Sequence, residues 1–147
     1  MPAVIEFYKV GDSYGQFSNF APYPITLKEK VWPTSEHYFQ AQKFVGTPHE
    51  EAIRLVESPM SAAKLGRSRD FPLRPDWEVV KDDLMREAVL AKFRQHRVLL
   101  ELLLATGDAE IVERTKNDSY WGDGGDGSGR NMLGRILMET RALLKHQ

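Results

Sequence analysis

The sequence contains no cysteine among its 147 residues. This absence excludes disulfide bonds, thiolate nucleophiles and cysteine zinc sites, and it fits a reducing compartment such as the cytoplasm. The chain also lacks a basic excess, because its formal net charge is -1 and its sequence pI is about 6.4. A protein that holds a polyanion by its backbone needs such an excess, so non-specific nucleic-acid binding is not expected.

Long apolar runs and metal-binding patterns are missing as well. No window approaches the roughly 20 apolar residues that span a bilayer, and the N-terminal segment MPAVIEFYKV has one lysine and only a brief apolar run. The histidines lack the HExxH spacing, no GxSxG elbow is present, and the acidic loop near the C-terminus lacks the closing glutamate of an EF-hand. We therefore expect neither membrane insertion nor a metal ion or other cofactor.

The distribution of apolar residues and breakers predicts a mainly α (α+β) fold: one compact multi-helix domain over residues 1–147 with a small N-terminal β-sheet or hairpin. A strand is expected at Val4–Val10, and Ile25–Leu27 is expected to pair with Val31–Trp32. The alternation of strand and helix that is typical of a parallel sheet is absent. Residues 111–114 are ambiguous between strand and helix.

Helix boundaries are predicted from capping residues. The segment Thr47-Pro48-His49-Glu50 reads as a capping box, and the leucine-rich stretch 96–106 reads as a central buried helix. Trp77, Val80, Leu84, Ala88 and Ala91 recur on one face of the longest helix. The other expected caps are Thr34 or Ser35, Asp76 and Asn131, and a short helix is expected from Ser58 to Leu65.

The helix that begins near Thr34 places polar residues on one stripe. At about 100° per residue, Glu36, Gln40 and Lys43 fall on the same face. If that face lines a cleft, Glu36 is a candidate general acid or base, and Lys43 is a candidate anion ligand or amine nucleophile. The alternative is a solvated stripe with a hydrogen-bonded Glu-Gln pair.

A glycine-rich loop, residues 120–130, precedes the last helix. Its glycines would let the backbone approach a ligand, and free N–H groups at the helix N-terminus would suit a phosphate or a sugar hydroxyl. Asp123 and Asp126 are candidates to stabilise positive charge on a ribose ring, and Trp121 is a candidate to stack on a base. The alternative is a mobile loop in which Asp and Gly only form turns.

One local cluster of basic residues offers a second place for a phosphate, although it fits a solvated loop equally well. Its members are Lys64, Arg67, Arg69 and Arg74.

Three stretches together resemble the NADAR (YbiA-like) family. They are Tyr14-Gly15-Gln16-Phe17-Ser18-Asn19-Phe20, the helix segment Trp32-Pro33-Thr34-Ser35-Glu36-His37-Tyr38-Phe39-Gln40-Ala41-Gln42-Lys43-Phe44, and Asp118-Ser119-Tyr120-Trp121-Gly122 followed by Gly129-Arg130-Asn131-Met132-Leu133-Gly134. Shorter matches, such as Leu65-Gly66-Arg67 and Lys92-Phe93, extend the resemblance over nearly the whole chain.

The resemblance implies a cytoplasmic N-glycosidase that hydrolyses the bond between a ribose phosphate and a nitrogenous base. Two substrate classes are associated with the family: phosphorylated aminopyrimidine intermediates of riboflavin synthesis, and ADP-ribosylated guanine in nucleic acid. The absence of a basic tail favours the small molecule. A non-catalytic module that binds ADP-ribose or NAD is the alternative from another functional class.

The resemblance also assigns expected roles to residues. Glu36, Lys43 and Asp126 are expected to be catalytic, with either water attack at C1 or a Schiff base on Lys43. Arg67 is the candidate for the phosphate. The remaining substrate contacts are expected from Ser18, Asn19, Phe20, Gln40, Trp121, Gly122 and Asn131.

Overall fold

The computed structural model describes residues 3–147, and the chain divides into two compact units. Unit 1 combines the described residues up to Ala21 with Phe93–Gln147, and unit 2 is Pro22–Lys92. The described residues form six α-helices and four short strands, and the strands pair into two sheets of two strands each. This content confirms the predicted mainly α (α+β) class. The expectation of a single domain stays a prediction.

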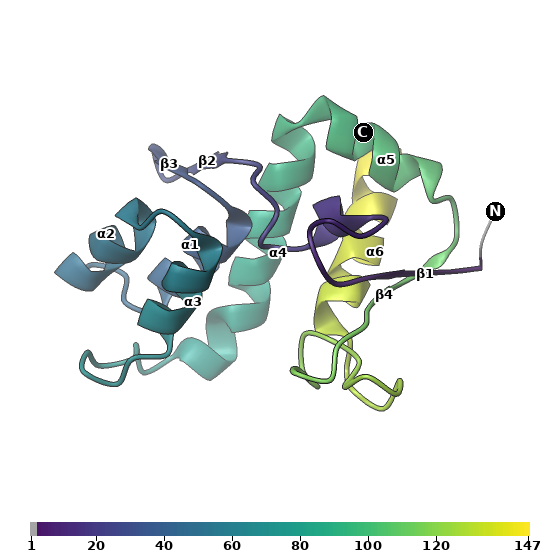
Figure 1. Ribbon diagram of the computed structural model, residues 1–147. Helices are drawn as coiled ribbons and strands as arrows, with labels where there is room; N and C mark the ends of the chain where they lie inside the picture. The colour runs from purple at the N-terminus through teal and green to yellow at the C-terminus, as the bar shows by residue number, and fades with distance from the viewer. Residues whose placement is uncertain (1–2) are drawn as a thin grey trace. The chain divides into compact units, whose positions relative to one another are not determined.

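Unit 2 begins with the predicted hairpin (Figure 1). Strands β2 (Ile25–Leu27) and β3 (Lys30–Trp32) pair antiparallel, so the turn consists of Lys28 and Glu29 alone. Both turn residues have positive φ, 56° and 63°. Positive φ at both central residues is the geometry of a tight type I′ turn, which is built here without glycine or asparagine.

Three short helices follow the hairpin: α1 (Ser35–Gln42), α2 (Pro48–Leu55) and α3 (Pro59–Gly66). Helix α3 confirms the short helix expected from Ser58 to Leu65, and the Ser58 hydroxyl caps it by accepting the N–H of Ser61 at 3.0 Å. Helix α4 (Trp77–Gln95) comes next and continues from unit 2 into unit 1. Its predicted apolar face is confirmed at Trp77, Ala88 and Ala91, which are buried, whereas the other two positions are half-buried.

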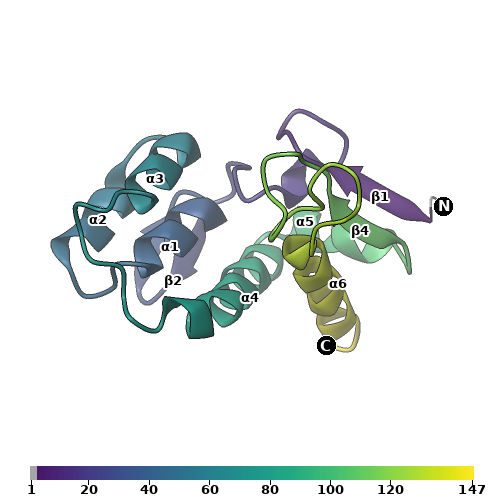
Figure 2. The ribbon, with the colours of Figure 1, turned by 90° about the horizontal axis from the view of Figure 1, so that it is seen from below.

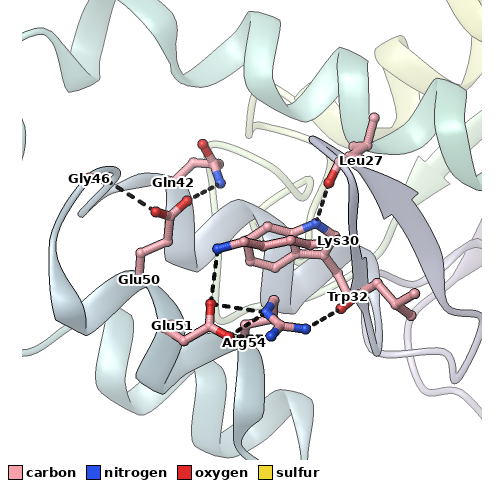
Figure 3. A network of polar contacts seen from close by, with 9 residues as sticks. Leu27, Lys30, Trp32, Gln42, Gly46, Glu50, Glu51 and Arg54 are labelled. Atoms are coloured by element: carbon pink, nitrogen blue, oxygen red, sulfur yellow. Dashed lines mark hydrogen bonds and ion pairs between the residues drawn. The ribbon is translucent and has the colours of Figure 1, made fainter.

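The capping box predicted at the start of α2 is wrong. The Thr47 hydroxyl donates instead to the carbonyl of Phe44 at 2.7 Å, and the Glu50 carboxylate accepts the N–H of Gly46 at 3.1 Å (Figure 3). The reason is the short connection between α1 and α2, which turns at Gly46 with φ 83°. This turn brings the carbonyl group of Phe44, which lies just after α1, within reach of the Thr47 side chain.

Large side chains from the hairpin and the helices form the core of unit 2. The rings of Trp32 and Tyr38 meet edge to face at 5.0 Å, and the Trp32 Nε1–H donates to the Leu27 carbonyl at 2.9 Å. At the surface beside this core, Glu51 binds Lys30 and Arg54 (Figure 3). The buried cluster comprises Ile25, Trp32, Tyr38, Ala41, Phe44, Ile53, Ala62, Ala88 and Ala91.

Unit 1 contains one parallel strand pair, formed by β1 (Val4–Phe7) and β4 (Glu110–Glu113) (Figure 2). The ambiguous segment is therefore a strand, and it pairs in parallel although the sequence lacks a strand-helix alternation. A 3-10 turn, η1 (Gly15–Phe17), places the Phe17 ring between those of Phe7 and Phe93, at 5.9 and 5.8 Å. Helices α5 (Arg97–Ala105) and α6 (Met132–Lys145) complete the unit.

The prediction that α5 is a central buried helix is wrong. Only Leu99 and Leu103 are buried in it, whereas Val98 is 66% exposed and Leu104 37% exposed. Its leucines occur on every side, so their number does not reveal which face is covered. The apolar face predicted for α6 is confirmed, because Leu133, Leu137, Thr140 and Leu144 are all buried. None of the helices within residues 3–147 combines the length and hydrophobicity needed to cross a membrane.

Candidate active site

The N-terminus of α1 is fixed by Thr34 and His37. The Thr34 hydroxyl oxygen accepts the His37 backbone N–H at 3.1 Å, which confirms the predicted cap. The His37 ring lies between that hydroxyl (2.8 Å from Nδ1) and the Val56 carbonyl (3.0 Å from Nε2). Burial lowers the pKa of His37, so the ring is neutral and its Nε2–H donates to the carbonyl. His37 is therefore a structural residue of the helix start.

The polar stripe on α1 is buried, so the alternative of a solvated face is wrong. Glu36 and Gln40 are each 8% exposed. The Gln40 Nε2–H donates to Glu36 Oε2 at 2.8 Å, whereas Gln40 Oε1 is buried and accepts no hydrogen bond from the residues that the structure describes. The side-chain amide thus presents its donor to the carboxylate, which is the orientation that favours an ionised Glu36.

Lys43, at the end of α1, holds its amine in a partly buried position. Its Nζ donates to the Gly66 carbonyl at 3.3 Å and lies 5.7 Å from the centroid of the Trp77 ring. Burial is the largest influence on Lys43 and lowers the pKa of its ammonium, whereas the charge of Glu36 raises it. Three further cations lower this pKa: Arg69, Arg67 and Lys81. The amine therefore loses its proton more readily than an exposed lysine, as a nucleophile requires.

Gly66 closes the space beside this stripe. A Cβ atom at this position would lie 2.0 Å from Gln40 Oε1 and 2.7 Å from Gln40 Cδ. Only glycine lets the end of α3 approach α1 so closely. Gly66 therefore positions both the Gln40 amide and, through its carbonyl, the Lys43 amine.

The basic cluster predicted from the sequence separates into two groups. Arg67 and Arg69 act electrostatically on Lys43, as described above. Arg74 instead binds the end of α1, because its backbone N–H and its Nη1 donate to the carbonyls of Lys43 and Gln42 at 3.0 and 3.2 Å. The sequence analysis did not include the contribution of α4, which supplies Trp77 and Lys81 to the surroundings of Lys43. The four-residue spacing of Trp77 and Lys81 places them on one face of α4 and could have indicated this contribution.

The glycine-rich loop in unit 1 does not present a free helix N-terminus. The N–H groups of Asn131, Met132 and Leu133 donate to the carbonyls of Gly122, Tyr120 and Trp121 at 2.9, 3.0 and 3.0 Å. The predicted phosphate site on these groups is therefore wrong, because the loop folds back and uses them itself. The turn-forming part of the alternative is confirmed, because Asp123 and Asp126 each accept the N–H group two residues later, at 2.8 and 3.0 Å, and the mobility of the loop stays a prediction.

The two aspartates of this loop differ in environment. Asp123 is buried, and its Oδ1 accepts the N–H groups of Thr115 and Gly125 at 3.0 and 2.8 Å. Asp126 is exposed, and its Oδ1 accepts the N–H and hydroxyl of Ser128 at 3.0 and 2.6 Å. The bond from the Ser128 hydroxyl is the main reason that the pKa of Asp126 lies below its ordinary value. Asp123 has a structural role, and the catalytic role of Asp126 stays a prediction.

The other residues expected from the resemblance to contact substrate in unit 1 are at least half-buried. Ser18 and Asn19 are buried, and Ser18 Oγ accepts the N–H of Phe20 at 3.1 Å. Trp121 packs edge to face on Tyr120 at 4.9 Å. A Cβ atom at Gly122 would lie 2.6 Å from Thr115 Cγ2, so glycine is required there by packing. Contacts of these residues with a substrate stay predictions.

Asn131 precedes α6, but its side chain does not cap the helix. Its Nδ2 donates to the Ile111 carbonyl at 2.9 Å, and its Oδ1 accepts the Glu113 N–H at 2.9 Å. The side chain thus joins β4 to the start of α6, and the residue adopts a left-handed conformation with φ 51°. Both polar atoms of the amide are used within the protein.

Replacing Asn131 by alanine is expected to lower the free energy of unfolding by about 2–4 kcal/mol, because two buried backbone groups lose their partners. Urea unfolding followed by circular dichroism measures this change. Asn117→Ala is the control, since Asn117 is exposed and its side-chain amide donates to the exposed Tyr8 hydroxyl at 3.0 Å. Equal stability of the two variants, with activity lost only in Asn131→Ala, would show that Asn131 acts on the substrate instead.

Comparison with known proteins identifies the family. The NADAR domain model matches residues 6–145. The chain belongs to the NADAR family. It is 58% identical over 141 residues to the N-glycosidase YbiA of Escherichia coli, covering 96% of this chain and 88% of that protein. It is also similar to a solved NADAR structure, the NMR structure of E. coli YbiA, with a TM-score of 0.91 and 56% identity over 99% of this chain and 88% of that chain.

Two further relatives are named for an N-glycosidase and for riboflavin biosynthesis. A Nostoc punctiforme protein named an N-glycosidase is 47% identical over 145 residues, covering 97% of this chain and 93% of that protein. A Vibrio vulnificus riboflavin biosynthesis protein is 43% identical over 145 residues, which cover 99% of this chain and 40% of that longer protein. The predicted YbiA-like fold is confirmed. This NADAR chain is an enzyme that hydrolyses N-glycosidic bonds.

Proposed function

We propose that the substrates are small phosphorylated ribosyl amines, of the kind formed as aminopyrimidine intermediates in riboflavin synthesis. The name of the Vibrio vulnificus relative supports this substrate class. The observation that carries the catalytic part is the buried stripe of α1, where Glu36, Gln40 and Lys43 place a carboxylate and an amine of lowered pKa on one face. Arg67 supplies positive charge for the phosphate.

The arrangement on α1 favours a route through Lys43. The ribosyl ring opens when its oxygen takes a proton, and the neutral Lys43 amine adds to C1. The base leaves as a free amine once its nitrogen is protonated, which leaves a Schiff base between C1 and Lys43. Water then adds to C1, releasing the sugar aldehyde and restoring the lysine. Glu36 carries the protons between these steps.

The alternative route uses Glu36 to activate water against an oxocarbenium-like C1 without a covalent intermediate. Lys43 then acts only as a cation. For Asp126 we propose stabilisation of charge on the ribose. For Ser18, Asn19, Phe20, Trp121, Gly122 and Asn131 we propose base and ribose contacts. The family motif supports the base and ribose contacts, and the position of Asp126 in the glycine-rich loop supports its role.

Borohydride added during turnover is expected to inactivate the enzyme and to leave a reduced sugar phosphate on Lys43. The physical reason is that a Schiff base is reduced to a stable secondary amine, whereas an oxocarbenium route offers no such adduct. Mass spectrometry of peptides locates the modification. Lys64→Gln is the matched control, because Lys64 is an exposed lysine of α3 and should leave trapping unchanged.

The substrate class is tested by measuring base release. The native chain is assayed with phosphoribosyl aminopyrimidines, NAD-related nucleotides and ADP-ribosylated guanine. Release from the aminopyrimidines alone supports the proposal. Turnover of only the ADP-ribosylated base contradicts the substrate class. Active enzyme without a trapped adduct contradicts the Schiff-base route and leaves water attack.

A further inference from the structure

Lys81 lies on the face of α4 that is turned toward the Lys43 amine. Trp77, one helical turn earlier, has its ring 5.7 Å from Lys43 Nζ and 5.0 Å from the Phe39 ring of α1. Residues four apart lie above one another on a helix, so Lys81 shares this face. Its side chain is only 16% exposed, whereas that of Arg86 on the same helix is 42% exposed.

The ion pair of Lys81 is of the kind that is readily exchanged. Lys81 Nζ lies 2.7 Å from Glu78 Oε1, but the Glu78 side chain is 78% exposed. An ion pair with such an exposed partner contributes little to stability, because water solvates the carboxylate well. A ligand phosphate that approaches from the Lys43 side therefore competes with a well-solvated carboxylate for the Lys81 ammonium.

The charges around Lys43 are unbalanced. Arg67 and Arg69 from the segment after α3, together with Lys81 from α4, all act on its amine, and Glu36 is the opposing carboxylate. Arg69 folds back, with Nη1 donating to the Arg67 carbonyl at 3.3 Å. Counting Lys43 itself, four cations face two carboxylates, Glu36 and the Glu78 partner of Lys81, and this leaves an excess of positive charge that fits a dianionic group better than a neutral sugar.

We propose that Lys81 binds the phosphate monoester of the substrate, together with Arg67, and thereby directs the sugar toward Lys43. This inference rests on the proposed function for the identity of the substrate as a ribose phosphate. Lys81 is then a substrate-binding residue on α4, an element for which the sequence indicated only core packing. Burial is the main cause of the lowered pKa of Lys43, and Lys81 adds to it, so Lys81 acts on the nucleophile as well as on the phosphate.

Lys81→Gln is expected to weaken binding of ribose 5-phosphate about tenfold, which is typical of losing one hydrogen bond to a charged group. Isothermal titration calorimetry of the full chain measures the dissociation constant and needs no turnover. Arg86→Gln is the matched control, because Arg86 also pairs with an aspartate three residues earlier on α4, at 2.9 Å. Arg67→Gln should resemble Lys81→Gln, and Lys81→Arg should stay within about threefold of the native chain.

Steady-state kinetics distinguish a phosphate-binding role of Lys81 from a purely structural one. Lys81→Gln should raise KM for a phosphorylated substrate and leave KM for its dephosphorylated form unchanged. Removing this cation should also raise the pKa of Lys43, so the rise of activity with pH should move to higher pH. The pKa of Lys43 in this variant is still influenced by its burial and by the charges of Glu36, Arg67 and Arg69.

The possible outcomes separate this inference from the proposed function. Equal affinities of Lys81→Gln and Arg86→Gln for ribose 5-phosphate overturn the inference. An equal rise of KM for the phosphorylated and dephosphorylated substrates in Lys81→Gln also overturns it. Should Lys81→Gln fail to fold, loss of ribose 5-phosphate binding in the folded Lys81→Arg variant overturns it in the same way. Lys81→Gln could also bind ribose 5-phosphate tenfold more weakly while the native chain releases no base from any of the substrates. That result supports the phosphate-binding role of Lys81 and rejects the proposed substrate class.

Discussion

Glu36→Gln is expected to lower kcat by roughly 10²- to 10⁴-fold, the usual effect of removing a general acid-base group. The substitution keeps the size of the side chain and its ability to accept a hydrogen bond from Gln40, but the amide cannot carry a proton between substrate and water. KM should change little, because the phosphate and its cations are untouched. A base-release assay at saturating substrate measures the effect.

The control for this variant is Glu57→Gln. Glu57 is an exposed carboxylate in unit 2 and should leave kcat within about twofold of the native value, as surface substitutions generally do. Thermal unfolding of both variants shows whether the buried amide has disturbed α1. A folded Glu36→Gln enzyme with native kcat would reject Glu36 as the proton carrier in either chemical route.

The sequence predicted those parts of unit 2 that depend on local interactions. Thr34 caps its helix as expected, because an N-cap needs only a side-chain oxygen and an N–H group three residues later. The common face of Glu36, Gln40 and Lys43 follows from helical spacing alone. Whether that face is buried depends on α3 and α4, which pack against it, so the sequence left both alternatives open.

Long-range interactions account for the errors. The amide of Asn131 reaches β4 rather than the helix that follows it, and the N–H groups at the start of α6 are used by carbonyls of the same loop. Neither pairing leaves a periodic pattern in the sequence. The parallel contact of β1 with β4 likewise joins distant segments. The role of Gly66 could not be predicted from the sequence either, because it depends on how closely α3 approaches α1.

Gly66→Ala is expected to reduce kcat by roughly hundredfold while the protein stays folded. A Cβ at this position would lie 2.0 Å from Gln40 Oε1, and that oxygen is the far end of a flexible side chain. The amide can therefore swing away at a cost of about 1–3 kcal/mol in stability, as for other overpacked sites. Its movement takes the donor from Glu36, and displacements of about 1 Å at catalytic groups commonly cost about 10²-fold in rate.

The Gly11→Ala variant tests whether the fall in kcat comes from the position of Gly66 or from the loss of any glycine. An added Cβ at Gly11 meets nothing within 4 Å, so this variant should keep native activity and stability. A double-mutant cycle with Gln40→Ala isolates the contact. Once the Gln40 amide is absent, the added methyl group has no oxygen to displace, and the second substitution should change kcat by less than about threefold. Additive losses in the cycle would mean that Gly66 acts on catalysis without Gln40, through its carbonyl contact with Lys43 instead.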